Sequence, residues 1–173
     1  MKAFLISLAL LSSSLLNSHP VVSKSPAQES QAPSTCEEAV AEVARFKEVS
    51  SESGNGKGGD TWRSIKHTSA AGESFWEGFN FYKSDARFKK AVTQISESVE
   101  GLAGWKPLFD EQGHQIGQRV VKETRTDGKI TNVLIHRITD RAIRGISAPS
   151  WKVALAAEKA TITCPTEAGE NAN

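Results

Sequence analysis

Residues 116–139, IGQRVVKETRTDGKITNVLIHRIT, decide the fold of this chain. Two runs rich in valine, isoleucine and threonine, Ile116–Thr126 and Lys129–Thr139, lie on either side of Asp127-Gly128. An Asp-Gly pair between two such runs favours a two-residue type I′ turn, and therefore a β-hairpin. The sequence thus predicts an antiparallel sheet as the central element.

The same turn sets the register of the hairpin, because the two residues that flank it must pair. Counting back along both strands places Val121 opposite Leu134 and Arg119 directly opposite His136. Directly opposed residues have Cβ atoms about 4.5 to 5.5 Å apart on one face of the sheet. We therefore predict that a guanidinium and an imidazole meet on one patch. The alternative is an exposed polar pair with no further role.

Local patterns predict the remaining elements. Ser34 and Glu37 form a capping-box pattern ahead of an apolar stripe, which predicts a helix. Alternating aromatic residues predict a strand, and a run of glycine and serine predicts a mobile loop. Along the chain these are the loop Val49–Asp60, the strand Ser74–Phe81, a strand edge or short helix at Arg87–Ile95, and a helix Ser150–Lys159 capped by Ser150.

The ends of the chain differ in composition from its centre. Residues 1–18 join a basic start to an apolar run, which is typical of a signal peptide, with cleavage at 18 or as late as 23. This run is too short for a comfortable membrane span. Residues 19–34 have the composition of a disordered linker, 35–165 form the single folded domain, and 166–173 a flexible tail. These features predict a secreted protein without a membrane partner.

Cys36 and Cys164 are the two cysteines of the chain. In an exported protein they predict one disulfide that closes almost the whole domain into a loop. The alternative is two separate buried thiols. Neither these cysteines nor any other residues have the spacing of metal ligands, so we expect no metal and no cofactor.

The basic residues are concentrated in the body of the domain. Between Lys57 and Lys159 there are 17 Lys and Arg against 12 Asp and Glu, whereas the acidic excess lies in the first helix and the C-terminal tail. A basic body suits a polyanion such as RNA. A surface of mixed, solvated charges is the other interpretation.

Four short motifs occur in a fixed order between the two cysteines. They are Trp76-Glu77-Gly78-Phe79-Asn80-Phe81, Arg119-Val120-Val121, Val133-Leu134-Ile135-His136 and Thr161-Ile162-Thr163-Cys164. In this order the chain resembles the secreted guanyl-specific ribonucleases of fungi, part of the microbial ribonuclease family, and the ribonuclease-like effectors of plant-infecting fungi. Asn80 stands where that family has aspartate. The resemblance covers residues 36–164 and implies an α+β fold, with an N-terminal helix packed on a twisted antiparallel sheet.

The resemblance also implies roles for five residues. Ribonucleases of this kind use the 2′-hydroxyl of RNA as nucleophile and form a cyclic phosphate, which requires a base, a cation and an acid. By resemblance His136 is the acid, Arg119 holds the phosphate, and His67 is a second histidine beside the attacking hydroxyl. Glu77 would accept two N–H groups from guanine, and Trp76 would stack on the base.

Lys89 marks a departure from the family. The general-base glutamate of the family lies in a strand whose counterpart here is Phe88-Lys89-Lys90-Ala91-Val92. An ammonium group beside Arg119 cannot accept a proton, although it can contact a substrate phosphate. His67 is the most economical replacement for the base; Glu123 and Asp85 are less suitable. Segment 139–159 is an insertion relative to the family, so the resemblance does not establish a preference for guanine.

Two functions follow from these features. The favoured one is a secreted, monomeric, ribonuclease-like effector, delivered into host cells, that binds RNA or a host protein with weak or no hydrolysis. The second is an active guanyl-preferring endoribonuclease that leaves cyclic phosphate ends. No DNA specificity is expected from either. The third interpretation is a small exported α+β protein whose motif matches are accidental.

Overall fold

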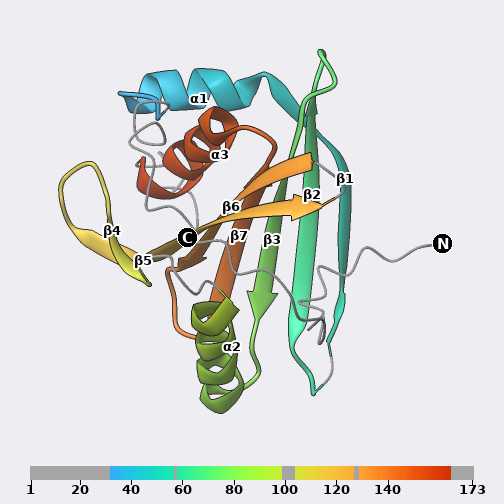
Figure 1. Ribbon diagram of the computed structural model, residues 1–173, viewed down its shortest axis with the longest axis vertical. Helices are drawn as coiled ribbons and strands as arrows, with labels where there is room; N and C mark the ends of the chain where they lie inside the picture. Colours follow the sequence, from blue (N-terminus) through green and yellow to red (C-terminus); the bar gives the residue numbers. More distant parts are fainter. Residues whose placement is uncertain (1–31, 57, 99–103, 127–128, 165–173) are drawn as a thin grey trace, which may run out of the picture.

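The computed structural model describes residues 32–56, 58–98, 104–126 and 129–164. They form an α+β fold built on one seven-stranded antiparallel sheet with the strand order β1-β2-β3-β7-β6-β5-β4 (Figure 1). The strands are β1 (Phe46–Asn55), β2 (Thr61–Ser69), β3 (Ser74–Phe81), β4 (Lys106–Phe109), β5 (Gln115–Thr126), β6 (Lys129–Arg137) and β7 (Ala142–Ala148). The helices are α1 (Cys36–Ala44), α2 (Asp85–Ser98) and α3 (Trp151–Glu158), and a π-helical turn (Lys159–Thr163) follows α3.

Helices cover the sheet from both sides. Val153 and Ala157 of α3 pack with Leu134 and Ile146 of the sheet in one apolar cluster. Helix α2 packs on the other side in a second cluster, which contains Phe88, Ile95, Val120 and Ile143. Adjacent residues of a strand point to opposite faces, so these clusters define an α3 face and an α2 face of the sheet.

The predicted hairpin is confirmed with its register. Strands β5 and β6 pair antiparallel, with Val121 opposite Leu134 and Arg119 opposite His136. Val121 and Leu134 belong to the apolar cluster under α3. Arg119 and His136, two residues along each strand, therefore lie on the α3 face as well. The turn residues Asp127-Gly128 lie outside the described residues.

Helix α1 begins one residue later than the sequence pattern predicted. Its N-cap is Thr35, and Thr35 and Glu38 form the reciprocal capping box, in place of Ser34 and Glu37. Ser34 instead donates hydrogen bonds to Glu38 from its backbone and its hydroxyl. The helix lies mainly against α3 and the π-helical turn (Figure 1), and its Val43 contacts the apolar cluster that α3 forms with the sheet. Packing of this helix on the sheet as the resemblance implied is therefore not supported.

The predicted disulfide joins the start of α1 to the end of the π-helical turn. Cys36 and Cys164 are bonded, across 128 positions of sequence. Thr161–Cys164, the last of the four sequence motifs, continue from α3 as the π-helical turn and its cap. The disulfide therefore fastens α1 to the π-helical turn that follows α3.

Two further segments differ from the sequence prediction. Most of the expected loop at 49–60 belongs to the edge strand β1, which pairs with β2 along its length apart from a bulge after Glu48. Backbone hydrogen bonds form this pairing, so a polar sequence does not prevent it. Gly54 has a specific role there, because a Cβ at this position would lie 3.1 Å from the Trp62 indole. The ambiguous segment 87–95 is part of helix α2.

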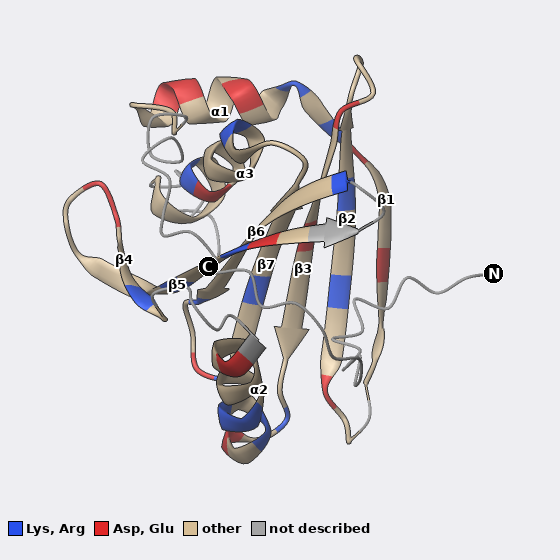
Figure 2. Ribbon diagram, viewed as in Figure 1, with Lys and Arg blue, Asp and Glu red and all other residues tan. Residues whose placement is uncertain are grey.

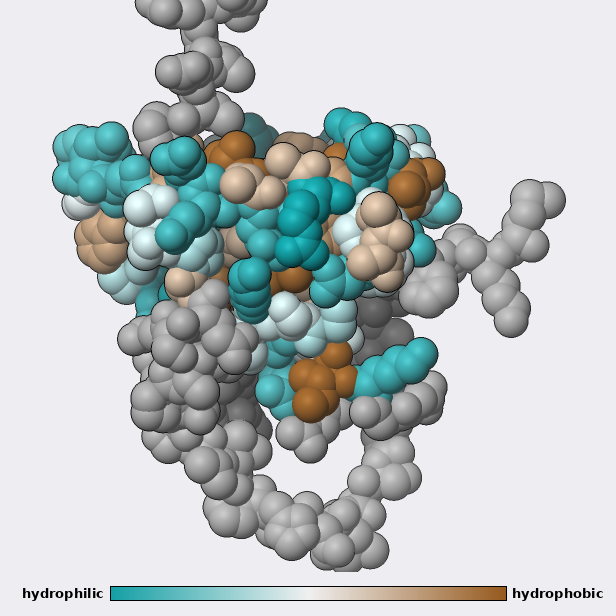
Figure 3. Space-filling model, turned by 90° about the horizontal axis from the view of Figure 1, so that it is seen from above, coloured by the Kyte–Doolittle hydropathy of each residue, from teal (hydrophilic) through white to brown (hydrophobic). Residues whose placement is uncertain are grey.

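The predicted signal peptide at 1–18, most of the linker at 19–34 and the tail at 166–173 lie outside the described residues. Among the residues that are described, no helix is long and apolar enough to cross a membrane. The surface seen from the α1 end is largely hydrophilic, with hydrophobic residues in separate groups (Figure 3).

Candidate functional site

One row of side chains crosses the α3 face from one edge of the sheet to the other. Each member is the register partner of the next, so all of them point to the same face. Lysine and arginine residues mark this level of the sheet on several strands (Figure 2). From β4 to β1 the row reads Lys106, Arg119, His136, Arg144, Phe79, Arg63 and Ser53. We call it the cationic row.

Glu158 joins two members of the cationic row. It is the last residue of α3 and nearly fully buried. One carboxylate oxygen is 2.6 Å from Arg119 Nη1, and the other is 2.6 Å from His136 Nε2. His136 itself has no exposed surface. Helix α3 thus inserts a carboxylate between the guanidinium and the imidazole that the hairpin brings together.

The surroundings of Glu158 favour its charged form. Burial by itself would raise the pKa of this carboxyl, but the hydrogen bond and charge of His136 and the charge of Arg119 outweigh it. The net pKa of Glu158 therefore lies below its ordinary value of 4.5. A group with a lowered pKa in the folded state stabilises the fold at pH values above its unfolded pKa. That contribution is lost as the pH falls through the folded pKa.

We expect the Glu158→Gln variant to respond less to acid than the wild type. Lowering the pH from above 4.5 through the folded pKa of Glu158 protonates this carboxylate and removes its contribution, whereas glutamine has no charge to lose. The measurement is urea unfolding at several pH values for both proteins. The difference between them should shrink as the pH falls, and a constant difference would show that Glu158 does not titrate in this range.

A second carboxylate holds the next arginine of the row. Arg144 Nη2 is 2.7 Å from Glu77 Oε1, and both guanidinium ends also donate to Thr161 of the π-helical turn. The guanidinium lies over the ring of Phe79, its row neighbour. His67 stacks on Phe75 and has its Nε2 atom 3.7 Å from Glu77, which is too long for a hydrogen bond.

Among the described residues of this region, three buried polar atoms have no hydrogen-bond partner. They are Nδ1 of His136, Nε of Arg144 and Nε2 of His67. Buried polar atoms in folded proteins are usually paired, so unpaired ones call for an explanation. Two of the three belong to opposed residues of the cationic row.

Arg63 and Lys106, near the two ends of the row, differ from the arginines between them. Among the described residues neither has a carboxylate within ion-pairing distance. Arg63 is exposed and donates one hydrogen bond from Nε to Ser51, 3.3 Å away. Its two terminal nitrogens therefore remain available to an anion. Arg119, by comparison, keeps about 28% of its side chain exposed beside Glu158.

The structure brings some of the predicted site residues together and separates others. Arg119 and His136 meet as predicted. His67 lies on β2, which is three strand spacings from β6, the strand of His136. Along β2, His67 is also four residues from Arg63, the member of the row on that strand. Together these two displacements separate His67 from His136 by about 19 Å. The two histidines therefore cannot flank one reacting hydroxyl.

The predicted base-recognition pair is also separated. Trp76 and Glu77 are consecutive on β3, so their side chains point to opposite faces. Trp76 is partly exposed on the α2 face, with Lys66 Nζ 5.4 Å from its ring centre. Glu77 is buried on the α3 face and paired with Arg144. One base cannot contact both side chains.

Lys89 is not in a strand beside Arg119. It is an exposed residue of helix α2, which packs on the other face of the sheet. Lys89 therefore does not occupy the position of a catalytic carboxylate beside Arg119. The carboxylate nearest to Arg119 and His136 is Glu158, which the sequence motifs did not indicate. The signal in the sequence that could have indicated Glu158 is its position as the lone charged residue of the apolar run Val153–Glu158.

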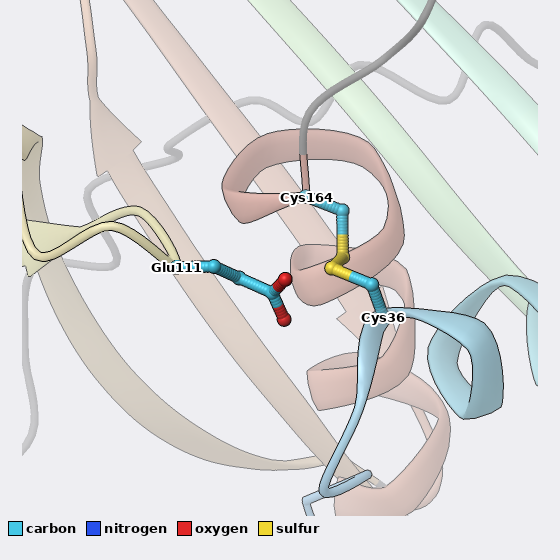
Figure 4. Close-up of side chains that lie close together, drawn as sticks. All are labelled: Cys36, Glu111 and Cys164. Carbon is cyan, nitrogen blue, oxygen red and sulfur yellow. A yellow bond between two sulfur atoms is a disulfide. The ribbon is translucent and has the colours of Figure 1, made fainter.

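The described residues contain one group of side chains with the proximity of metal ligands. Glu111 lies beside Cys36 and Cys164 (Figure 4). Both sulfur atoms are bonded to each other and neither is a thiolate, which is the form that binds metals. Lys159 Nζ also lies 3.5 Å from the Glu111 carboxylate. The group is a disulfide with a neighbouring ion pair, and it offers no set of ligands.

Comparison with protein families, with curated proteins and with solved structures found no match. The similarity to microbial ribonucleases therefore rests on the sequence motifs alone.

Proposed function

We propose that this protein binds RNA along the cationic row and cleaves it weakly or not at all. The observation that carries the proposal is the row itself, with Lys106, Arg119, Arg144 and Arg63 at one level of a single sheet face. Neutralisation of backbone phosphates by lysine and arginine is the main source of affinity for nucleic acids. Secretion and delivery into host cells remain predictions from the sequence.

The spacing of the row suits an extended anion better than a single phosphate. Neighbouring strands lie about 4.8 Å apart, so the side chains from Arg63 on β2 to Lys106 on β4 extend over about 24 Å. Glu77 and Glu158 neutralise part of this charge and hold the two central arginines in place. Arg63 and Lys106 have no such carboxylate, and they supply the net positive charge.

The burial of His136 is the reason to expect little hydrolysis. A general acid must reach the leaving oxygen directly or through one water molecule. His136 has no exposed surface, and its Nε2 atom is engaged with Glu158. In this arrangement the histidine positions Glu158 and Arg119, and it does not face a substrate.

We expect the oxidised mature domain to bind fluorescently labelled RNA with an affinity that falls as salt is added. Replacement of Arg63 by alanine should weaken binding at every salt concentration. It should also reduce the slope of log affinity against log salt by about 0.7 to 1. Fluorescence anisotropy measured over a salt series tests this expectation.

Lys90→Ala is the matched control, because Lys90 is an exposed residue of α2 on the other face. This variant removes the same charge from the protein without touching the row. Equal losses from Arg63→Ala and Lys90→Ala would show that net charge alone drives binding. No binding by the wild type at low salt would refute the proposal.

RNA cleavage is the second candidate function, and one observation favours it. Glu158 places a carboxylate against both Arg119 and His136, so a base, an acid and a cation lie within one cluster. The ends of the RNA after incubation decide between the two functions. Cyclic phosphate ends that form with the wild type and are absent with His136→Ala would establish catalysis. We expect none with either protein.

A further inference from the structure

A depression lies at the β1 end of the cationic row. Its volume is about 430 Å³, within the range of small-molecule sites. Arg63 and Phe81 line it, together with Ser53, Asn55 and Thr61, and with Gly54 and Trp62. Five of these residues share the α3 face, because Ser53 pairs with Arg63, Thr61 pairs with Phe81 and Asn55 pairs with Thr61. Gly54 and Trp62 alternate with them along their strands and belong to the α2 face. The depression therefore continues directly from the row.

On the α3 face the lining combines three kinds of group. Phe81 exposes 49% of its surface, so part of its aromatic ring is accessible to a stacking partner. Asn55, Thr61 and Ser53 offer amide and hydroxyl groups that can donate and accept hydrogen bonds. Arg63 supplies a guanidinium whose terminal nitrogens have no carboxylate partner among the described residues.

From this juxtaposition we infer that the depression binds one unpaired nucleobase, stacked on Phe81, with the adjoining phosphate on Arg63. This inference rests on the proposed binding of RNA by the cationic row and deepens it. Bases in a duplex are stacked on each other and closed to an aromatic side chain, whereas bases of a single strand are open. The substrate class is therefore single-stranded RNA with accessible bases.

Hydrogen bonding sets a limit on base selectivity. An asparagine amide can both donate to and accept from the edge of a base, and so can the hydroxyls of threonine and serine. No carboxylate is among the residues that line the depression. The paired acceptor that would select guanine is therefore missing here, and we expect a site that tolerates all four bases.

The test compares a short single-stranded oligonucleotide with an oligonucleotide of the same length that lacks its bases. Both carry the same phosphates, so a difference in affinity reports contacts to bases. We expect the wild type to bind the base-containing strand about tenfold more tightly, as one stacked base would allow. Phe81→Ala should remove this difference and leave the affinity for the abasic strand unchanged, and Phe81→Trp should restore it.

Trp76→Ala provides the comparison, because Trp76 is a partly exposed aromatic residue on the α2 face. If Phe81 binds the base, this variant keeps the full difference between the two strands. Equal affinities of the wild type for the two strands, with tight binding of both, would overturn the inference and leave the proposed function standing. Failure to bind either strand at low salt would overturn both.

Discussion

Replacing Cys36 and Cys164 together by alanine lowers the free energy of unfolding by about 4 to 5 kcal/mol. The disulfide joins residues separated by 128 positions, so it removes a large loop-closure entropy from the unfolded chain. The effect also has a local part, because the bond fastens α1 to the π-helical turn after α3. Urea unfolding of the oxidised wild type and the double variant measures the difference.

Reduced wild-type protein is the control for this measurement. It lacks the bond but keeps both side chains, so it should unfold at nearly the same urea concentration as the double variant. A larger loss in the variant than in the reduced protein would point to lost packing of Cys164, which is buried. A total loss below about 1 kcal/mol would contradict the entropic argument.

The second large effect is expected at Glu158. Replacement by leucine keeps the side chain close to the same size but leaves Arg119 and His136 without their shared acceptor. Breaking a buried charge pair by removing one partner costs about 3 to 5 kcal/mol, because the other charge stays buried. Arg119 retains a route to solvent, which should bring the loss toward the lower end. Thermal and urea unfolding at neutral pH measure it.

Glu73→Leu is the matched control for Glu158→Leu. Glu73 pairs with Arg45 at 2.7 Å, nearly the same distance as in the buried pair, but both side chains are about half exposed. An exposed ion pair contributes about 0 to 1 kcal/mol, so this variant should remain close to the wild type. Similar losses from the two variants would show that burial adds nothing to the Glu158 contacts. Restoration of the stability of Glu158→Leu by a second change, His136→Leu, would support coupling of the two residues.

Short-range signals in the sequence predicted several elements correctly. The Asp-Gly pair specified a hairpin and its register, and with them the pairing of Arg119 with His136. Ser150 was recognised as the cap of α3, and the structure has its hydroxyl accepting from Val153 N. Each of these features depends on residues close in sequence or on a count along two adjacent strands, so local rules are sufficient.

Other predictions failed because they required knowledge of distant partners. The resemblance placed Lys89 in a strand, whereas its apolar neighbours Phe88, Val92 and Ile95 pack as one side of helix α2. Val49–Asp60 was predicted to be a loop from its composition. The backbone of this segment as far as Asn55 belongs to the edge strand β1, because β2 presents a full row of hydrogen-bonding groups to it.

The roles predicted for Trp76 and Glu77 also failed because they depended on tertiary packing. The motif Trp76–Phe81 was correctly predicted to be a strand, and strand alternation already requires consecutive residues to face opposite ways. Which face holds α3, and which face holds α2, depends on packing that the motif does not contain. That packing buries Glu77 against Arg144 and leaves Trp76 on the other side.

By itself the sequence determined the hairpin register, the disulfide between the two cysteines and the cap of the last helix. Only the tertiary structure decided which cations are neutralised, which are free, and that His136 is enclosed. The physical reason is the distance along the chain over which the contacts form. Glu158 reaches Arg119 across 39 residues, and only because α3 packs its apolar side on Leu134 and Ile146. Arg63 stays available because no such carboxylate is packed against it among the described residues.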